Sequence, residues 1–231
     1  MTTAPRTARA VARAELTRAI LDAAGEQLAA VGPAALSVRQ VARELGMASS
    51  AVYRYFPTRD SLLTALIAEA FDSLGQAAED ADAAAGRDDL RARWLAMAHA
   101  IHDWARAHPH RYALAYGSPV PGYAAPTDTV EPAVRLPRAL LAVSRAAQDQ
   151  GAEGAPVRAV SPAEAAALGP VQELAGGLDP GPTVRALVVW AALLGHVSLE
   201  LFGHMDNAVL DHDAHFAQVA EQLADDLGLV P

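Results

Sequence analysis

Apolar residues recur at helical spacing through most of this 231-residue chain, and Gly and Pro interrupt the pattern between one stretch and the next. Apolar side chains three and four positions apart share one face of an α-helix, whereas a half-buried strand requires strict alternation. The chain has no convincing alternating stretch and no internal repeat. The sequence therefore predicts an all-α fold. We expect helices over residues 15–31, 38–45, 49–56, 58–71, 91–108, 130–150, 162–174, 182–204 and 211–227.

Three of these helices and a connector fill the first seventy residues. Ser37 and Gln40 have the spacing of a capping box, in which each side chain satisfies the other's backbone amide. Gly46 stands where the chain must turn left-handed, and Thr58 caps the connector, with Asp60 in its first turn. A short helix, a Gly turn and a second short helix form the layout of a helix-turn-helix DNA reader.

The charge distribution agrees with this layout. The net charge of −9 at first argues against binding nucleic acid, because cationic side chains supply much of the affinity for phosphates. Residues 1–60, however, contain eight Arg and five acidic residues, a net charge of +3, which leaves −12 for the remainder. This asymmetry fits a basic DNA-binding part, residues 1–60, followed by an acidic remainder. The DNA-binding part is called the reading head below, and the remainder is called the body. The absence of Cys excludes disulfides, thiolate metal sites and cysteine nucleophiles.

The run from Leu36 to Leu63 resembles the N-terminal signature of the TetR family of transcription regulators. Its marks are Val41-Ala42, Gly46, Tyr53, Tyr55, Phe56 and the Arg59-Asp60-Ser61-Leu62-Leu63 start of the next helix. Residues 104–123, with the motifs His-Pro-His-Arg-Tyr and Tyr-Gly-Ser-Pro-Val-Pro-Gly-Tyr, and residues 190–204 are similar to the WHG-type ligand domain of some TetR-like regulators.

The resemblance implies a domain order and a function. An N-terminal arm and a three-helix helix-turn-helix domain would occupy residues 1–60, and a helical ligand-binding and dimerisation domain residues 61–231, with the connector helix beginning near residue 58. We expect a homodimer that binds a double-stranded, near-palindromic DNA operator and is released by an unknown small-molecule effector. We expect no cofactor, no metal and no enzymatic activity.

The resemblance also assigns roles to residues of the reading head. It implies that phosphates are met by Ser37, Tyr53, Tyr55 and Arg59, and that base edges are met by Arg39, Ser49, Ser50, Ala51 and Arg54. The family often has His in place of Tyr55 and Lys in place of Arg59. Helix N-termini are suited to phosphate, and the forked Arg donors are suited to guanine. Phe56 is predicted to be core, and the Tyr53 ring to bridge core and phosphate.

The body of the protein holds candidate residues for a ligand pocket. Aromatic side chains with a few polar tips are typical of small-molecule sites, although each could equally be ordinary core. The candidates are Trp94, Met97, His102, Tyr112, Tyr116, Tyr123, Trp190 and His196. The helix over 183–204 is apolar on more than one side, which indicates two packing partners, and the sequence does not decide which row faces a second subunit.

Three alternatives stay open at this point. Arg6, Arg9 and Arg13 form either an arm that reaches the minor groove or a solvated tail. Eight His, with pairs one helical turn apart, leave room for an all-α metal-binding enzyme. The third alternative is a DNA-binding protein without an effector.

The sequence also bears on location. The N-terminus lacks the apolar stretch of a signal peptide, so we expect a cytoplasmic protein with no membrane partner. The most apolar segment, 184–202, carries charged and polar residues and is predicted to be a buried helix.

Overall fold

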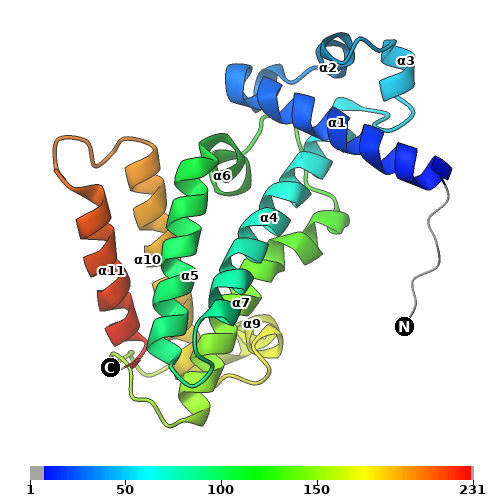
Figure 1. Cartoon of the computed structure of the whole chain (residues 1–231). Helices are drawn as coiled ribbons and strands as arrows, with labels where there is room; N and C mark the ends of the chain where they lie inside the picture. Colours follow the sequence, from blue (N-terminus) through cyan, green and yellow to red (C-terminus); the bar gives the residue numbers. More distant parts are fainter. Residues whose placement is uncertain (1–7, 230–231) are drawn as a thin grey trace. The chain divides into compact units, whose positions relative to one another are not determined.

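The computed structural model describes residues 8–229 and confirms the all-α prediction, with no strand in that range. Its α-helices and two short 3-10 helices are α1 (Ala8–Val31), η1 (Pro33–Ala35), α2 (Val38–Glu44), α3 (Ser49–Val52), α4 (Arg59–Ala84), α5 (Leu90–Ala107), α6 (Pro109–Tyr116), η2 (Thr127–Thr129), α7 (Val130–Asp149), α8 (Pro162–Ala167), α9 (Gly169–Leu174), α10 (Pro180–Leu201) and α11 (His212–Asp226) (Figure 1).

Two compact units divide the chain. The N-terminal unit comprises Met1–Ala70 and His110–Thr129, and the C-terminal unit comprises Phe71–Pro109 and Val130–Pro231. The long helix α4 contributes residues to both units, so the chain passes from one to the other without leaving helical structure. The domain boundary near residue 60 stays a prediction.

The N-terminal unit has a small apolar core beneath its short helices. α1 contributes Ile20 and Leu28, α2 contributes Val41, and Val52 and Phe56 complete the core around α3. Each of these side chains is at most 7% exposed, and burying one of this size is worth roughly 1.5–3 kcal/mol relative to exposure. A four-residue helix such as α3 is too short to be stable alone. Its position therefore depends on this tertiary packing.

α4 begins with a reciprocal cap. The Ser61 amide donates to Thr58 Oγ1 at 2.9 Å, and the Thr58 amide donates to Ser61 Oγ at 3.1 Å. These bonds satisfy amides that have no partner within the helix. The predicted cap at Thr58, with Asp60 in the first turn, is confirmed.

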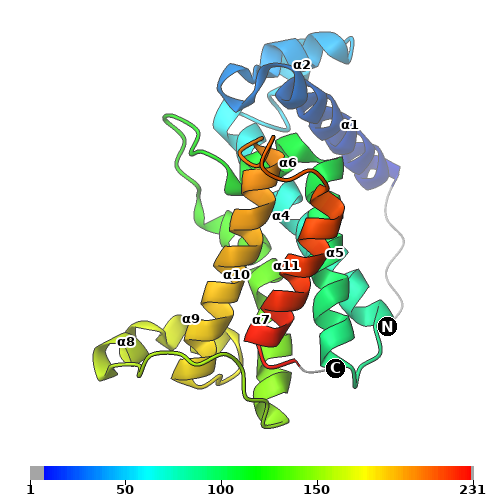
Figure 2. The same ribbon diagram turned by 90° about the vertical axis from the view of Figure 1, so that its left-hand side faces the viewer.

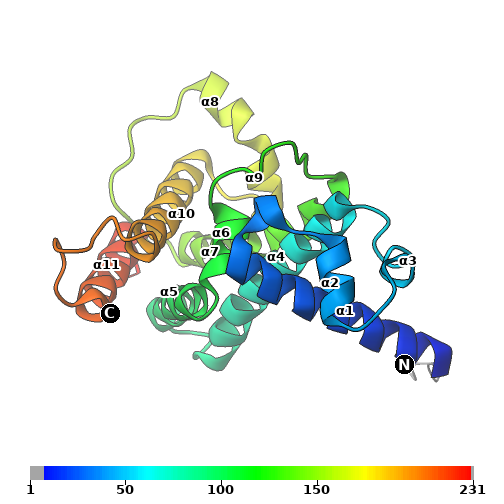
Figure 3. The same cartoon turned by 90° about the horizontal axis from the view of Figure 1, so that it is seen from above.

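The C-terminal unit is a helical bundle in which α10 packs against α5, α7 and α11, while α5 also contacts α7 and α11. Figure 2 shows α10 and α11 running beside α5, and Figure 3 shows the three nearly end-on as neighbours. Trp94 on α5 donates its indole N–H to the carbonyl of Ala220 on α11, at 2.9 Å. Arg91 adds ion pairs to Glu221 and Asp225. These contacts tie α5 to α11 along one side of the bundle.

Several predicted helices differ from those of the structure. The helix predicted over 58–71 continues to Ala84, the helix predicted over 49–56 ends at Val52, and α6 was not predicted. The helix predicted over 15–31 begins by Ala8, so Arg9 and Arg13 are helical residues of α1, while Arg6 lies outside the described residues. The helix predicted over 162–174 is in fact two, α8 and α9, because Pro170 lies in the first turn of α9, where its ring ends one helix and suits the start of another.

Candidate nucleic-acid interface and ligand cavity

The helix-turn-helix is shaped by local hydrogen bonds. Ser37 caps α2, its Oγ accepting from the Gln40 amide at 3.4 Å. The helix is followed by Gly46, whose φ of +64° lies in the left-handed region that Gly adopts without steric cost. The Met47 amide then donates to the Ala42 carbonyl at 2.8 Å. This bond closes the predicted turn, and α3 follows at once (Figure 1).

The capping of α2 differs from the predicted capping box in its second half. The Ser37 amide donates to Oε1 of Gln27 on α1, at 2.6 Å, and not to Gln40. Gln40 instead pairs with Arg43 and Glu44 on the exposed side of α2. Gln27 is only 6% exposed and must find a partner for its amide oxygen inside the protein, whereas Gln40 finds partners at the surface. As a result α1 holds the N-terminus of α2.

The residues predicted to meet DNA lie on and around these helices. Arg39 on α2, Ser50 on α3 and Arg54 just after α3 are exposed. Tyr53 is 38% exposed, and its bridging of core and phosphate stays a prediction, whereas Phe56 is buried as predicted. The other candidates are half-buried: Ser37, Ser49, Ala51, Tyr55 and Arg59.

Arg59 and Tyr55 are engaged within the N-terminal unit. The Nη2 of Arg59 donates to the carbonyls of Pro33 at 2.6 Å and Ala34 at 3.3 Å. The guanidinium of Arg13 lies 5.1 Å from the centroid of the Tyr55 ring, within the range of a cation–π contact. Arg59 therefore braces the turn η1 between α1 and α2. Its contact with phosphate stays a prediction.

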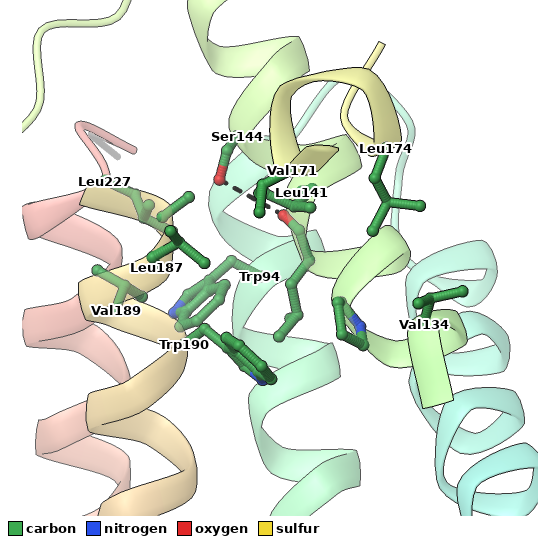
Figure 4. A pocket seen from close by; sticks show the side chains of 13 residues that line it. Trp94, Val134, Leu141, Ser144, Val171, Leu174, Leu187, Val189, Trp190 and Leu227 are labelled. Carbon is green, nitrogen blue, oxygen red and sulfur yellow. Dashed lines mark hydrogen bonds between the residues drawn. The ribbon is translucent and has the colours of Figure 1, made fainter. Parts of the chain in front are cut away.

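A cavity of about 200 Å³ lies inside the C-terminal unit. Its walls come from α5, α7, α9 and α10, with Leu227 beyond the end of α11 (Figure 4). Trp94 and Trp190 supply the aromatic surface and Ser144 the only hydroxyl among the described lining residues. The rest of the lining is aliphatic or proline: Val134, Pro137, Leu140, Leu141, Val171, Leu174, Ala186, Leu187, Val189 and Leu227.

Of the predicted pocket residues, Trp94 and Trp190 line this cavity. Met97 follows Trp94 by three residues on α5 and is fully buried, but it is not part of the lining. The three tyrosines belong to the N-terminal unit: the Tyr123 hydroxyl lies 2.9 Å from Thr64 Oγ1, and the other two are Tyr112 and Tyr116. Sequence reasoning missed the aliphatic walls on α7 and α9, because Leu and Val give no signal that separates a cavity wall from filled core.

The two predicted histidines lie instead around Glu200, where α5, α10 and α11 meet. His102 Nε2 lies 3.0 Å from both carboxylate oxygens of Glu200, and its ring stacks on Phe216 at 3.9 Å. His196 Nε2 is 4.0 Å from the same carboxylate. Burial, followed by the nearby His215, lowers the pKa of His196, and Glu200 opposes this shift. His196 therefore favours the neutral form.

One side of α10 is apolar and exposed. Val188 is 61% exposed and Leu199 is 45% exposed, and Ala191 and Ala192 between them are also exposed. Ala191 and Ala192 are three and four residues after Val188, and Leu199 is two turns beyond Ala192, so all four lie on one helix face. We call Val188, Ala191, Ala192 and Leu199 the α10 stripe. Apolar surface that is continuous along a helix is typical of an interaction site.

Among the described residues, α10 is long and apolar enough to cross a membrane, with a mean hydropathy of 1.5 over an 18-residue window. Only 28% of that window is buried within the chain, in agreement with the exposed stripe. A core helix of a soluble protein passes the same test, so this finding is weak evidence for a membrane. Within residues 8–229, no group of three or more His, Asp or Glu side chains is placed to hold a metal ion.

Two family models match the chain. Residues 20–66 match the model described as bacterial regulatory proteins, tetR family, and residues 94–223 match the model described as tetracyclin repressor-like, C-terminal domain. The first match covers the helix-turn-helix. The second match covers every residue that lines the cavity except Leu227.

Individual proteins give the same result. HTH-type transcriptional regulator Rv1816 of Mycobacterium tuberculosis is 37% identical over 205 residues, which cover 83% of each chain. The solved structure of regulatory protein SCO4313 is 35% identical, with a TM-score of 0.75 over 95% of this chain and 98% of that one. A tetR-family regulatory protein from Rhodococcus RHA1, at 17% identity and a TM-score of 0.64 over 93% and 98%, shares the fold.

Proposed function

Since the chain belongs to the TetR family of DNA-binding transcription regulators, we propose that it is a dimeric repressor that a small-molecule effector releases from a near-palindromic operator. The observation that carries the proposal is the cavity of the C-terminal unit, about 200 Å³ in volume and lined by Trp94 and Trp190. A domain needed only for dimerisation would gain stability by filling such a space, because each unfilled core volume costs packing energy. A retained cavity is therefore consistent with a ligand site.

The reading head supplies the DNA contacts in this proposal. Exposed Arg39 and Arg54 read base edges, with Ser49, Ser50 and Ala51 beside them. Phosphates are met by Ser37, Tyr53, Tyr55 and Arg59, and these contacts fix the register of the head on the duplex. Because one short recognition helix covers few base pairs, a two-fold dimer that places two heads about one helical turn apart would supply the specificity.

The α10 stripe is the proposed dimer surface. A second copy of the stripe would cover Val188 and Leu199 and remove their apolar surface from water. Val188→Glu should place charges in that interface and give a monomer at micromolar concentration in sedimentation. The matched control is Val130→Glu on α7, where the side chain is 54% exposed outside the stripe. It should remain dimeric, and equal behaviour of the two variants would move the interface elsewhere.

The ligand response would pass through α4. This helix starts at the reading head and continues into the C-terminal unit, so a change in its direction changes the spacing of the two heads in a dimer. A ligand that prefers a different spacing must bind the DNA-bound dimer more weakly. A typical coupling would reduce operator affinity by about 5- to 150-fold.

Operator titration tests this proposal. The operator is first selected from random duplexes, and its affinity for the protein is then measured with and without a ligand whose binding has been verified. Lower affinity with the ligand supports a released repressor. Identical affinities would favour a DNA-binding protein that has no effector response. Soluble regulators of this family act in the cytoplasm, and we propose that location here.

A further inference from the structure

The walls of the C-terminal cavity carry no charge among the described residues. The lining has no acidic, basic or His side chain and consists of two indole rings, aliphatic side chains, one proline and Ser144 (Figure 4). Transferring a charged group from water into such surroundings is unfavourable unless an opposite charge or several hydrogen bonds meet it. The cavity therefore disfavours carboxylates, ammonium groups and phosphates.

The two tryptophans of the lining do not offer their polar atom to the cavity. Trp94 Nε1 donates at 2.9 Å to the carbonyl of Ala220 on α11, a residue outside the lining. Trp190 Nε1 is shielded from solvent, so this residue meets the cavity with carbon atoms of its ring. The Ser144 hydroxyl donates to the carbonyl of Leu140, one turn earlier on α7, at 3.4 Å. Among the described lining side chains, Ser144 is therefore the one that could still accept a hydrogen bond from a bound molecule.

Water inside the cavity would also find few partners. A buried water needs about two to four polar partners, and the described lining side chains offer one hydroxyl, which already donates to Leu140. A polar group of a ligand would therefore lose its hydrogen bonds to bulk water and find at most one side-chain partner. Because burial of a hydroxyl or an amide without such partners is unfavourable, polar groups should lower affinity for this cavity.

The volume limits the size of the ligand. An apolar cavity of about 150 Å³ holds benzene, and drug-sized sites begin near 300 Å³. At about 200 Å³ the present cavity lies between these limits, so it suits one ring that carries a short alkyl group.

We propose that the cavity binds an uncharged, apolar molecule about the size of an alkylbenzene, held by apolar contact without a hydrogen bond to a side chain, and that this is the chemical class of the effector. The inference rests on the proposed ligand response and names the chemistry of its ligand. The rings of Trp94 and Trp190 and the aliphatic side chains of α7, α9 and α10 then select the ligand by its shape and by its lack of polar groups.

Three probes of similar shape separate the effects of polarity and charge. They are propylbenzene, 2-phenylethanol, which has the same number of non-hydrogen atoms but ends in a hydroxyl, and phenylacetate, which ends in a carboxylate. Their dissociation constants for the full-length protein without DNA are measured by calorimetry. We expect propylbenzene to bind about tenfold more tightly than 2-phenylethanol, the effect of burying one hydroxyl without partners. Phenylacetate should show no binding at concentrations at which propylbenzene saturates the protein.

Variants assign binding to this cavity. Val171→Phe on α9 places a larger side chain in the wall, so it should fill the space and remove binding of propylbenzene. Val130→Phe is the matched control, because Val130 is 54% exposed and does not line the cavity. It should keep the affinity of the unmodified protein. Ala186→Leu on α10 fills the cavity from another wall with a smaller change in volume, and it should weaken binding even where Val171→Phe fails to fold.

Equal binding of propylbenzene and 2-phenylethanol to the unmodified protein would overturn the inference, as would preferred binding of phenylacetate or no binding of any probe. Unchanged binding of propylbenzene to filled variants that circular dichroism shows to be folded would place the ligand outside this cavity, which overturns it too. Operator release is measured separately. If propylbenzene binds as expected but operator affinity stays the same, the ligand chemistry of the cavity stands and the proposed repressor release fails. If a charged or polar molecule releases the operator instead, only the ligand chemistry fails.

Discussion

Gln27 on α1 is not a predicted DNA contact, but we expect it to stabilise the helix-turn-helix. Its side-chain oxygen accepts the Ser37 amide at 2.6 Å, and the residue is 6% exposed. Gln27→Met preserves the length of the side chain and removes the acceptor. The first amide of the α2 cap is then left without its partner. An unsatisfied buried amide costs about 1–3 kcal/mol. Because Ser37 is half-buried and water can reach its amide in part, we expect Gln27→Met to lower the free energy of unfolding by about 1–2 kcal/mol.

Thermal unfolding at a fixed protein concentration measures this loss. For a chain of this size 1 kcal/mol corresponds to roughly 2–4 °C, so Gln27→Met should lower the midpoint by about 2–8 °C. Gln40→Met is the matched control. Gln40 makes only exposed contacts with Arg43 and Glu44, of a kind worth about 0.2–0.5 kcal/mol. The capping account fails if Gln40→Met destabilises the protein as much as Gln27→Met, or if neither variant changes the midpoint.

Other predictions concern DNA reading and pH. Arg54→Ala should cost about 1–3 kcal/mol on the operator and less on random DNA, if it reads a guanine; equal losses on both would reassign it to phosphate. Arg59→Ala should weaken operator and random DNA alike and also lower the unfolding midpoint, since its guanidinium holds the η1 carbonyls; an unchanged midpoint would contradict that brace. The folded-state pKa of His196 is lowered by burial and by His215, against the effect of Glu200, so its neutral form contributes stability above the ordinary value of 6.5 that is lost as pH falls below it. Urea unfolding at pH 7.5 and 5.5 should therefore show a smaller loss of stability on acidification in His196→Asn, and an unchanged loss would refute this assignment.

Local signals in the sequence predicted much of the reading head. Gly46 must be left-handed, Thr58 caps α4, and Ser37 caps α2, because turns and caps depend on residues within a few positions of one another. The partner of the Ser37 amide was not predictable in this way. Gln27 lies ten residues away on another helix, and only the packing of α1 against α2 brings it there.

The C-terminal cavity was predictable only in part, for a related reason. Trp94 and Trp190 were candidates because they are large and carry a polar atom, and both line the cavity. The aliphatic walls, such as Leu140 on α7, follow the same helical periodicity as filled core, and their location at a cavity depends on how the helices pack. His102 was also a candidate for the pocket because of its polar atoms. Its side chain instead pairs with Glu200 on another helix, a contact that the sequence does not reveal.

The central claim is that the C-terminal cavity and the reading head are thermodynamically coupled, and the most direct test is a reciprocal binding measurement. Operator affinity is measured with and without saturating ligand, and ligand affinity is measured with and without saturating operator. Linkage requires that both affinities fall by the same factor, which we expect to be about 5- to 150-fold. A ligand that binds the operator-bound and the free protein with equal affinity would contradict the account.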